Sequence, residues 1–233
     1  MKTFDYSLVK DPQYFRDGRM DAHSDHTYYR DGEEAQEKET SFRYDLNGIW
    51  KFHYARNYGS AIPGFEKADY CCKDWDDIRV PAHIQMEGYD APQYANVQYP
   101  WEGHEDIHPG EIPEHFNPVA SYVKYFEVPE EMQGKRLFIS FQGAESGIAL
   151  WLNGQFVGYS EDSFTPSEFE LTEYVKRRAK TNSQHRCLNG QQAVGARIRI
   201  SIVSLEFTEM FIFIPCRRFM FMTFRSVQSR TKL

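Results

Sequence analysis

The dipeptide Asn153-Gly154 is the feature that most constrains how this chain can fold. Asn-Gly favours the two-residue turn of a β-hairpin, because both residues tolerate positive φ. Here it separates two mainly apolar segments of strand length, residues 148–152 and 155–159. A second Asn-Gly, at 47–48, precedes residues 49–54, in which every second side chain is aromatic. The sequence therefore predicts antiparallel strands joined by tight turns.

Similar short patterns recur along the chain at fairly even spacing. Further strands are expected over 75–80, where Pro81 ends the pattern, over 120–128 and over 135–142. A short helix is expected over Gly32–Lys38. Together these elements predict an all-β fold, a jelly-roll-like antiparallel β-sandwich that follows an extended N-terminal arm.

Residues 88–118 form a stretch rich in Pro, Gly, His and Tyr, which we interpret as one long irregular loop. Long ordered loops in compact domains usually carry function, because their backbone must be held by specific contacts rather than by a regular ladder. We therefore expect the functional residues of this chain in that loop.

Composition restricts the class of protein. A hydrophobic fraction of 41% suits a packed core, and no apolar run is long enough for a membrane-spanning helix. The first residues lack the apolar stretch of a signal peptide. Cys71 and Cys72 are adjacent, whereas Cys187 and Cys216 are distant, so neither a disulfide framework nor a zinc site is indicated. We expect a cytoplasmic protein with no membrane partner.

The charge of the chain changes sign near residue 177. Residues 1–176 hold 16 Lys and Arg against 32 Asp and Glu, whereas residues 177–233 hold 11 Lys and Arg against only Glu206 and Glu209. A basic tail of this kind either binds nucleic acid or marks the junction of two unrelated sequences.

Four strings identify a family resemblance when they are taken together. They are AHSDH at 22–26, LNGIWKF at 46–52, VPAHIQMEGYDAPQYANVQYPW at 80–101 and WLNGQFVGYSEDSFTPSEFELTEYVK at 151–176. In this order they resemble the amino-terminal sugar-binding domain of glycoside hydrolase family 2 β-galactosidases, a galactose-binding-domain-like β-sandwich. The resemblance divides the chain into an arm over residues 1–41, an incomplete sandwich over 42–176 and a tail outside the family pattern over 177–233.

The resemblance implies a cytoplasmic, often homo-oligomeric enzyme that hydrolyses terminal β-galactosides such as lactose with retention of configuration. Retention needs two carboxyl groups about 5–5.5 Å apart. In the family both are glutamates of a barrel that follows the sandwich, so we expect no catalytic residue here. Full-length members resemble Mg- and Na-dependent enzymes, but we expect no cofactor and no metal ligand in this piece.

The resemblance also implies a substrate contact. Asn96, with Val97 beside it, occupies the position from which the family's loop reaches over the barrel to the bound galactose. A side-chain amide offers both donors and an acceptor to sugar hydroxyls. The alternative is that Asn96 only turns the loop. One departure affects the arm, because Gly18-Arg19 stands where the family usually has Asn-Arg in a segment that helps subunits assemble.

Other polar clusters have simpler interpretations. His23, Asp25 and His26 lack the spacing of a metal motif, so we expect ordinary hydrogen bonds in the arm. We expect the paired carboxylates to be a solvated surface rather than an acid/base pair; they are Glu161 with Asp162 and Glu168 with Glu170. The histidines of the long loop are interpreted as loop polarity; they are His104, His108 and His115.

We interpret the change at residue 177 as a shift of reading frame. In the frame one base earlier, each codon takes the third base of one residue and the first two of the next. Met210 followed by Phe211 then encodes Val, and Glu209 followed by Met210 encodes Asp or Asn. One permitted reading of residues 178–227 contains EDQD and SGIYRDVYL, which resemble the missing family continuation. On this interpretation no nucleic-acid partner is expected, and the sandwich lacks its closing strands.

Three functions remain open. The chain is a truncated enzyme fragment that is inactive alone, a free-standing carbohydrate-binding module, or an assembly fragment that complements a partner lacking its own amino-terminal part. Its partners would be a β-galactoside and the remaining domains of the enzyme. Uncovered strand edges near residues 120–159, together with the apolar segment Met210–Ile214, predict a poorly soluble product.

Overall fold

A computed structural model describes residues 2–23, 27–91, 105–108, 111–175, 196–207 and 210–213. Within these ranges strands dominate, and the helical elements are short. The latter are the 3-10 turns η1 (Tyr6–Lys10), η2 (Tyr58–Ser60) and η3 (Glu130–Met132) and the helix α1 (Gly32–Glu37). No helix in the described part of the chain is long and apolar enough to span a bilayer.

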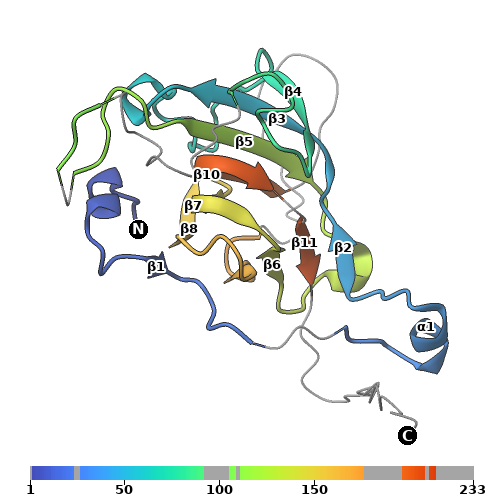
Figure 1. Cartoon of the computed structure of the whole chain (residues 1–233). Helices are drawn as coiled ribbons and strands as arrows, with labels where there is room; N and C mark the ends of the chain where they lie inside the picture. The colour runs from blue at the N-terminus through green and yellow to red at the C-terminus, as the bar shows by residue number, and fades with distance from the viewer. Residues whose placement is uncertain are drawn as a thin grey trace, which may run out of the picture.

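Two antiparallel sheets make up the molecule (Figure 1). The large sheet has the order β1-β8-β7-β10-β5-β3-β4. Its strands are β1 (Arg16–Asp17), β3 (Gly48–Ala55), β4 (Asp76–Val80), β5 (Val119–Phe126), β7 (Ala144–Leu152), β8 (Gln155–Ser160) and β10 (Ala196–Phe207). The small sheet has the order β2-β11-β6-β9, with β2 (Arg43–Asp45), β6 (Phe138–Phe141), β9 (Ser167–Glu170) and β11 (Met210–Phe213).

One continuous core joins the two sheets. Trp50 and Phe52 of β3 and Leu150 of β7 belong to the same buried cluster as Ile139 of β6 and Phe169 of β9. Every second residue of the strands contributes, because successive side chains of a strand point to opposite faces. The predicted all-β sandwich is therefore confirmed.

The alternate residues of the large sheet form a second apolar cluster on its outer face. Trp151 of β7 and Tyr159 of β8 belong to it, together with Phe65 and Trp75 of the β3–β4 connection. Phe4 of the arm closes the cluster, with ring centroids 5.9 Å from Trp151 and 5.2 Å from Tyr159. The arm is thus part of the packing and not a free extension.

Several local predictions are confirmed. The β7–β8 turn has φ of 53° at Asn153 and 83° at Gly154, as a two-residue hairpin turn of this sequence requires. Helix α1 begins after Asp31, whose side chain accepts hydrogen bonds from the amides of Glu33 and Glu34, and it ends at Glu37. Strand β4 ends at Val80, immediately before Pro81.

The prediction that β5 and β7 have open edges is wrong. Each of these strands is paired with β10 along the edge that was expected to be open. Strand β10 lies between them, with Ile200 opposite Tyr122 of β5 and Leu150 of β7. Strand β11 in turn lies between β2 and β6. The unpaired N–H and C=O groups of a sheet edge form hydrogen bonds with any strand that can reach them. Two segments after residue 195, β10 and β11, provide such strands.

Candidate functional site

The predicted substrate contacts, Asn96 and Val97, lie outside the described residues, as do the aromatic residues Tyr94, Tyr99 and Trp101 around them. The structure does describe both ends of the loop that carries them. The loop follows β4 and a buried Ile84, and it leads into β5 at Val119.

The entry of the loop is held against the end of β3. The ring of Tyr89 packs edge-on against Phe52, with centroids 4.5 Å apart. Burial, followed by the neighbouring Asp90 carboxylate, raises the pKa of Tyr54 to about 12, which places the Asp90 side chain beside this phenol. A neutral phenol next to a carboxylate is a stable arrangement at the pH of the cell.

The exit of the loop is held at the same place. The amide of Asn117 donates to the carbonyl oxygen of Arg56 over 3.1 Å, one residue beyond β3. The Asn117 side chain donates to the hydroxyl of Tyr6 in the arm over 3.2 Å. The carboxylate of Glu105 accepts hydrogen bonds from the amides of Glu114 and His115, at 2.7 and 3.0 Å, and so folds the exit segment on itself. Both ends of the loop thus converge on the end of β3.

Two acceptors at the entry of the loop have no donor among the described residues. Oε1 of Gln85 and Oδ2 of Asp90 are buried and accept no hydrogen bond there. Leaving a buried polar atom without a partner costs about 1–3 kcal/mol.

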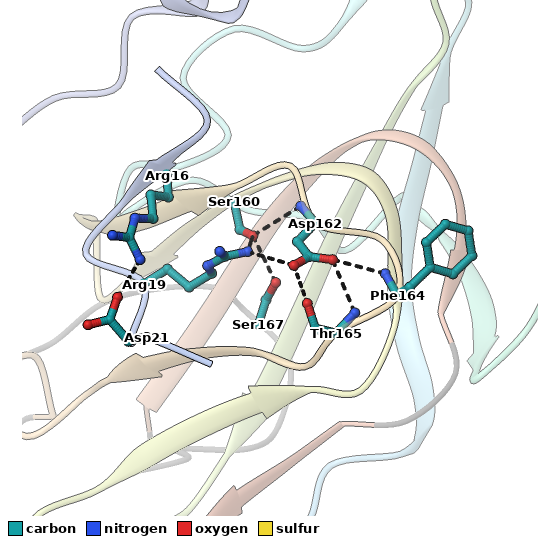
Figure 2. Close-up of polar contacts among 8 residues, drawn as sticks. All are labelled: Arg16, Arg19, Asp21, Ser160, Asp162, Phe164, Thr165 and Ser167. Atoms are coloured by element: carbon teal, nitrogen blue, oxygen red, sulfur yellow. Dashed lines mark hydrogen bonds and ion pairs between the residues drawn. The ribbon is translucent and has the colours of Figure 1, made fainter. Parts of the chain in front are cut away.

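A second polar region joins the arm to the β8–β9 connection (Figure 2). The Arg19 guanidinium donates to Oγ of Ser160 over 3.0 Å and lies 3.3 Å from Oδ2 of Asp162. The hydrogen bond from the Thr165 hydroxyl, followed by backbone amides of the same loop and by Arg19, holds the pKa of Asp162 below its usual range although partial burial opposes this. Phe164 points away from this cluster and is 93% exposed.

The interpretation of the paired carboxylates as a solvated surface is wrong for Glu168. This residue is only 8% exposed, and it accepts hydrogen bonds from Ser140 over 2.9 Å and contacts Nε2 of His23 at 2.5 Å. The other three each have a different partner: Tyr159 for Glu161, Arg19 for Asp162 and Arg136 for Glu170. They therefore form structural contacts and not an acid/base pair.

His23 makes the ordinary contact that was expected of the arm, whereas Asp25 and His26 lie outside the described residues. Met20, Asp21 and Ala22 line a small surface hollow with His23, opposite Thr165, Pro166 and Glu168. In the part of the chain that the structure describes, no three His, Cys, Asp or Glu side chains come together in a way that could hold a metal ion. Sequence reasoning missed the contacts of Arg19 with Ser160 and of His23 with Glu168, because the two partners of each contact lie more than 100 residues apart.

Comparison with known proteins gives a consistent result. Residues 43–187 match the model of the sugar binding domain of glycosyl hydrolases family 2. The chain is 55% identical over 177 residues to a β-galactosidase of Halalkalibacterium halodurans, covering 75% of this chain and 18% of the relative. It is 47% identical over 169 residues to a β-galactosidase of Streptococcus thermophilus, covering 72% of this chain and 16% of the relative.

Among solved structures, a glycosyl hydrolase family 2 member from Bacteroides cellulosilyticus aligns with a TM-score of 0.48 and 17% identity. The alignment covers 74% of this chain and 20% of that chain. In each of these comparisons the chain spans a fifth or less of the length of the protein that it matches.

Proposed function

Because the chain belongs to glycosyl hydrolase family 2 through its sugar-binding domain, we propose that it is the amino-terminal piece of a β-galactosidase. The enzyme would hydrolyse terminal, non-reducing β-D-galactose residues of lactose-type substrates with retention. The piece supplies a scaffold and one substrate-contacting loop, and it has no activity alone. Its partners are the β-galactoside, the remaining domains of the enzyme and other subunits in a homo-oligomer of the cytoplasm.

The anchoring of loop 88–118 is the observation that carries this proposal. Both ends of the loop are fixed at the end of β3, by Asp90 beside Tyr54 and by the hydrogen bond from Asn117 to Arg56. A loop held at both ends can present a side-chain amide at a defined place, which is what recognition of sugar hydroxyls needs. We assign this role to Asn96, with Val97 beside it.

Retention needs two carboxyl groups about 5–5.5 Å apart across the scissile bond, and we place both of them in a part of the enzyme outside this piece. The carboxylates around the β8–β9 connection are engaged in holding the fold instead.

A chimera tests the substrate contact directly. Residues 1–175 of this chain would replace the matching segment of the Halalkalibacterium halodurans β-galactosidase, and hydrolysis of p-nitrophenyl β-galactoside would be measured. We expect an active chimera in which Asn96→Ala lowers kcat/KM about 10- to 100-fold, the effect of losing one or two hydrogen bonds to the sugar. Gln133→Ala, on the exposed surface, is the matched control and leaves kcat/KM unchanged.

The isolated chain separates the alternatives. Purified alone, it is expected to show no turnover of the same substrate and no binding of isopropyl thiogalactoside at millimolar concentration by saturation-transfer NMR. Binding without turnover would instead identify a free-standing carbohydrate-binding module. Turnover by the chain alone, or an Asn96→Ala chimera as active as its parent, would contradict the proposal.

A further inference from the structure

The arm pairs with the edge strands of both sheets at the same side of the sandwich. Arg16 and Asp17 of β1 lie opposite Ser160 and Tyr159 of β8, the edge of the large sheet. A few residues later, Arg19 forms an antiparallel bridge with Phe169 of β9, the edge of the small sheet. The amide of Met20 then donates to the carbonyl oxygen of Glu168 over 2.9 Å. Residues 16–20 therefore close the gap between the two sheets.

Two glycines allow this close approach. Gly18 has φ of 68°, and a Cβ there would lie 2.7 Å from the carbonyl oxygen of Val157. A Cβ on Gly158 would lie 2.4 Å from the carbonyl oxygen of Asp17 and 2.6 Å from the Phe169 ring. Real Cβ atoms do not approach other atoms so closely, so a side chain at either position would push the arm away from β8. The backbone of the arm therefore packs directly against the backbone of β8 at these two glycines.

Within its described part, the arm has no fully buried residue of its own to hold it in this seat. Among the described residues that precede Leu46, none is buried, and neither η1 nor α1 contributes a buried side chain. Segments with few buried contacts open at lower free energy than the core of a domain. The arm nevertheless covers buried aromatic residues of the outer face, Trp151, Phe156 and Tyr159, through the rings of Phe4 and Tyr14.

Arg19 is one of the side-chain contacts that fasten the arm to the sandwich, beside His23 with Glu168 and Tyr6 with Asn117. Its side chain is 12% exposed, and it bonds Ser160 of β8 while pairing with Asp162 of the following loop. Asp162 is itself fixed, because its carboxylate accepts hydrogen bonds from the amides of Phe164 and Thr165. Arg16, three residues earlier, forms an ion pair with Asp21, whose side chain is 88% exposed (Figure 2). Among the described residues, Arg19 rather than Arg16 therefore links the arm to the β8–β9 connection through its side chain.

We propose that residues 2–23 form a detachable strap, clamped by Arg19, that opens while the two sheets stay folded. Opening breaks the pairing of β1 with β8 and of Arg19 with Phe169, so that the edges of β8 and β9 and the aromatic outer face become accessible together. The strap is thus a conformational device that controls access to one edge and one face of the domain.

Hydrogen exchange followed by mass spectrometry tests this proposal on the purified 233-residue chain. In the wild type, the amides of peptides covering 15–20 exchange at least tenfold faster than those of β5 and β7. Arg19→Met, which keeps the aliphatic stem, raises the rate of the arm about tenfold further and leaves β5 and β7 unchanged. Arg16→Met is the matched control and leaves both regions at the wild-type rates. Binding of the dye ANS rises in Arg19→Met alone.

Each other result decides against the strap. If Arg19→Met raises exchange in the arm and in β5 and β7 equally, the arm opens only with the whole domain. If the variant exchanges like the wild type, Arg19 is not the clamp. Should Arg19→Met fail to fold, the wild-type measurement still decides, because equal rates for the arm and the core strands would exclude separate opening.

Discussion

At the scale of single residues, Asp162 combines the most partners in the described polar network. It pairs with Arg19, and it accepts hydrogen bonds from two amides and the Thr165 hydroxyl of its own loop. All of these contacts favour the charged carboxylate, and they hold its pKa below the usual range, with the Thr165 hydroxyl as the largest cause.

This shift predicts a dependence of stability on pH. A carboxyl group whose pKa is lower in the folded chain stabilises it above the unfolded pKa of about 3.9, and the contribution is lost as the pH falls through the folded pKa. Asp162→Asn is expected to lower the free energy of unfolding by about 1 kcal/mol at pH 7. Urea unfolding at pH 7 and near pH 3 should show this difference shrinking.

Asp21→Asn provides the comparison, because that carboxylate is 88% exposed and pairs only with Arg16. It should change the free energy of unfolding by less than about 0.5 kcal/mol at either pH. An Asp162→Asn loss of equal size at both pH values would show that the side chain acts through packing and not through its charge.

At the scale of elements, the sequence predicted the strands whose signal is local. The Asn153-Gly154 turn, the alternation of β3 and the proline that ends β4 each act over a few residues, and the structure has all three. The sequence did not predict the pairing of the arm with β9 or the burial of Glu168. Their partners are distant in the sequence, and no local hydrophobic pattern indicates such contacts. Asn96 and Val97 were placed by family resemblance alone, and their role stays a prediction.

Strand β10 is the element for which the sequence interpretation failed. The change of charge and pattern at residue 177 places this segment outside the sandwich, yet its backbone pairs with β5 and β7 in the middle of the large sheet. Ile200→Pro should therefore be severely destabilising, by about 3 kcal/mol or more, because a central strand cannot accommodate proline. The midpoint of urea unfolding measures this effect.

Ile200→Val is the matched substitution, since it keeps a β-branched residue and should cost at most about 1.5 kcal/mol. If Ile200→Pro unfolds at the same urea concentration as the wild type, the segment is not part of the cooperative sheet, and the edges of β5 and β7 are open as the sequence first indicated.

At the scale of the whole molecule, the charge break near residue 177 needs an origin. We propose that the tail results from a shift of reading frame, because the frame one base earlier permits EDQD and SGIYRDVYL within residues 178–227. Determining the nucleotide sequence through codons 170–240 tests this. We expect that frame to stay open and to encode the continuation of the family sequence.

An early stop codon in that frame, or codons that do not permit the two strings, would contradict the shift and leave the tail as a native sequence.

The place of β10 has a consequence for how the chain is made. It is the middle strand of the large sheet, but it follows every other strand of that sheet in the sequence. A ribosome therefore releases β3 with β5, and β7 with β8, before the strand that unites these two pairs has left the exit tunnel. Until residues 196–207 emerge, the nascent chain holds two half-sheets whose facing edges are unpaired, and unpaired edges of this kind favour aggregation during synthesis.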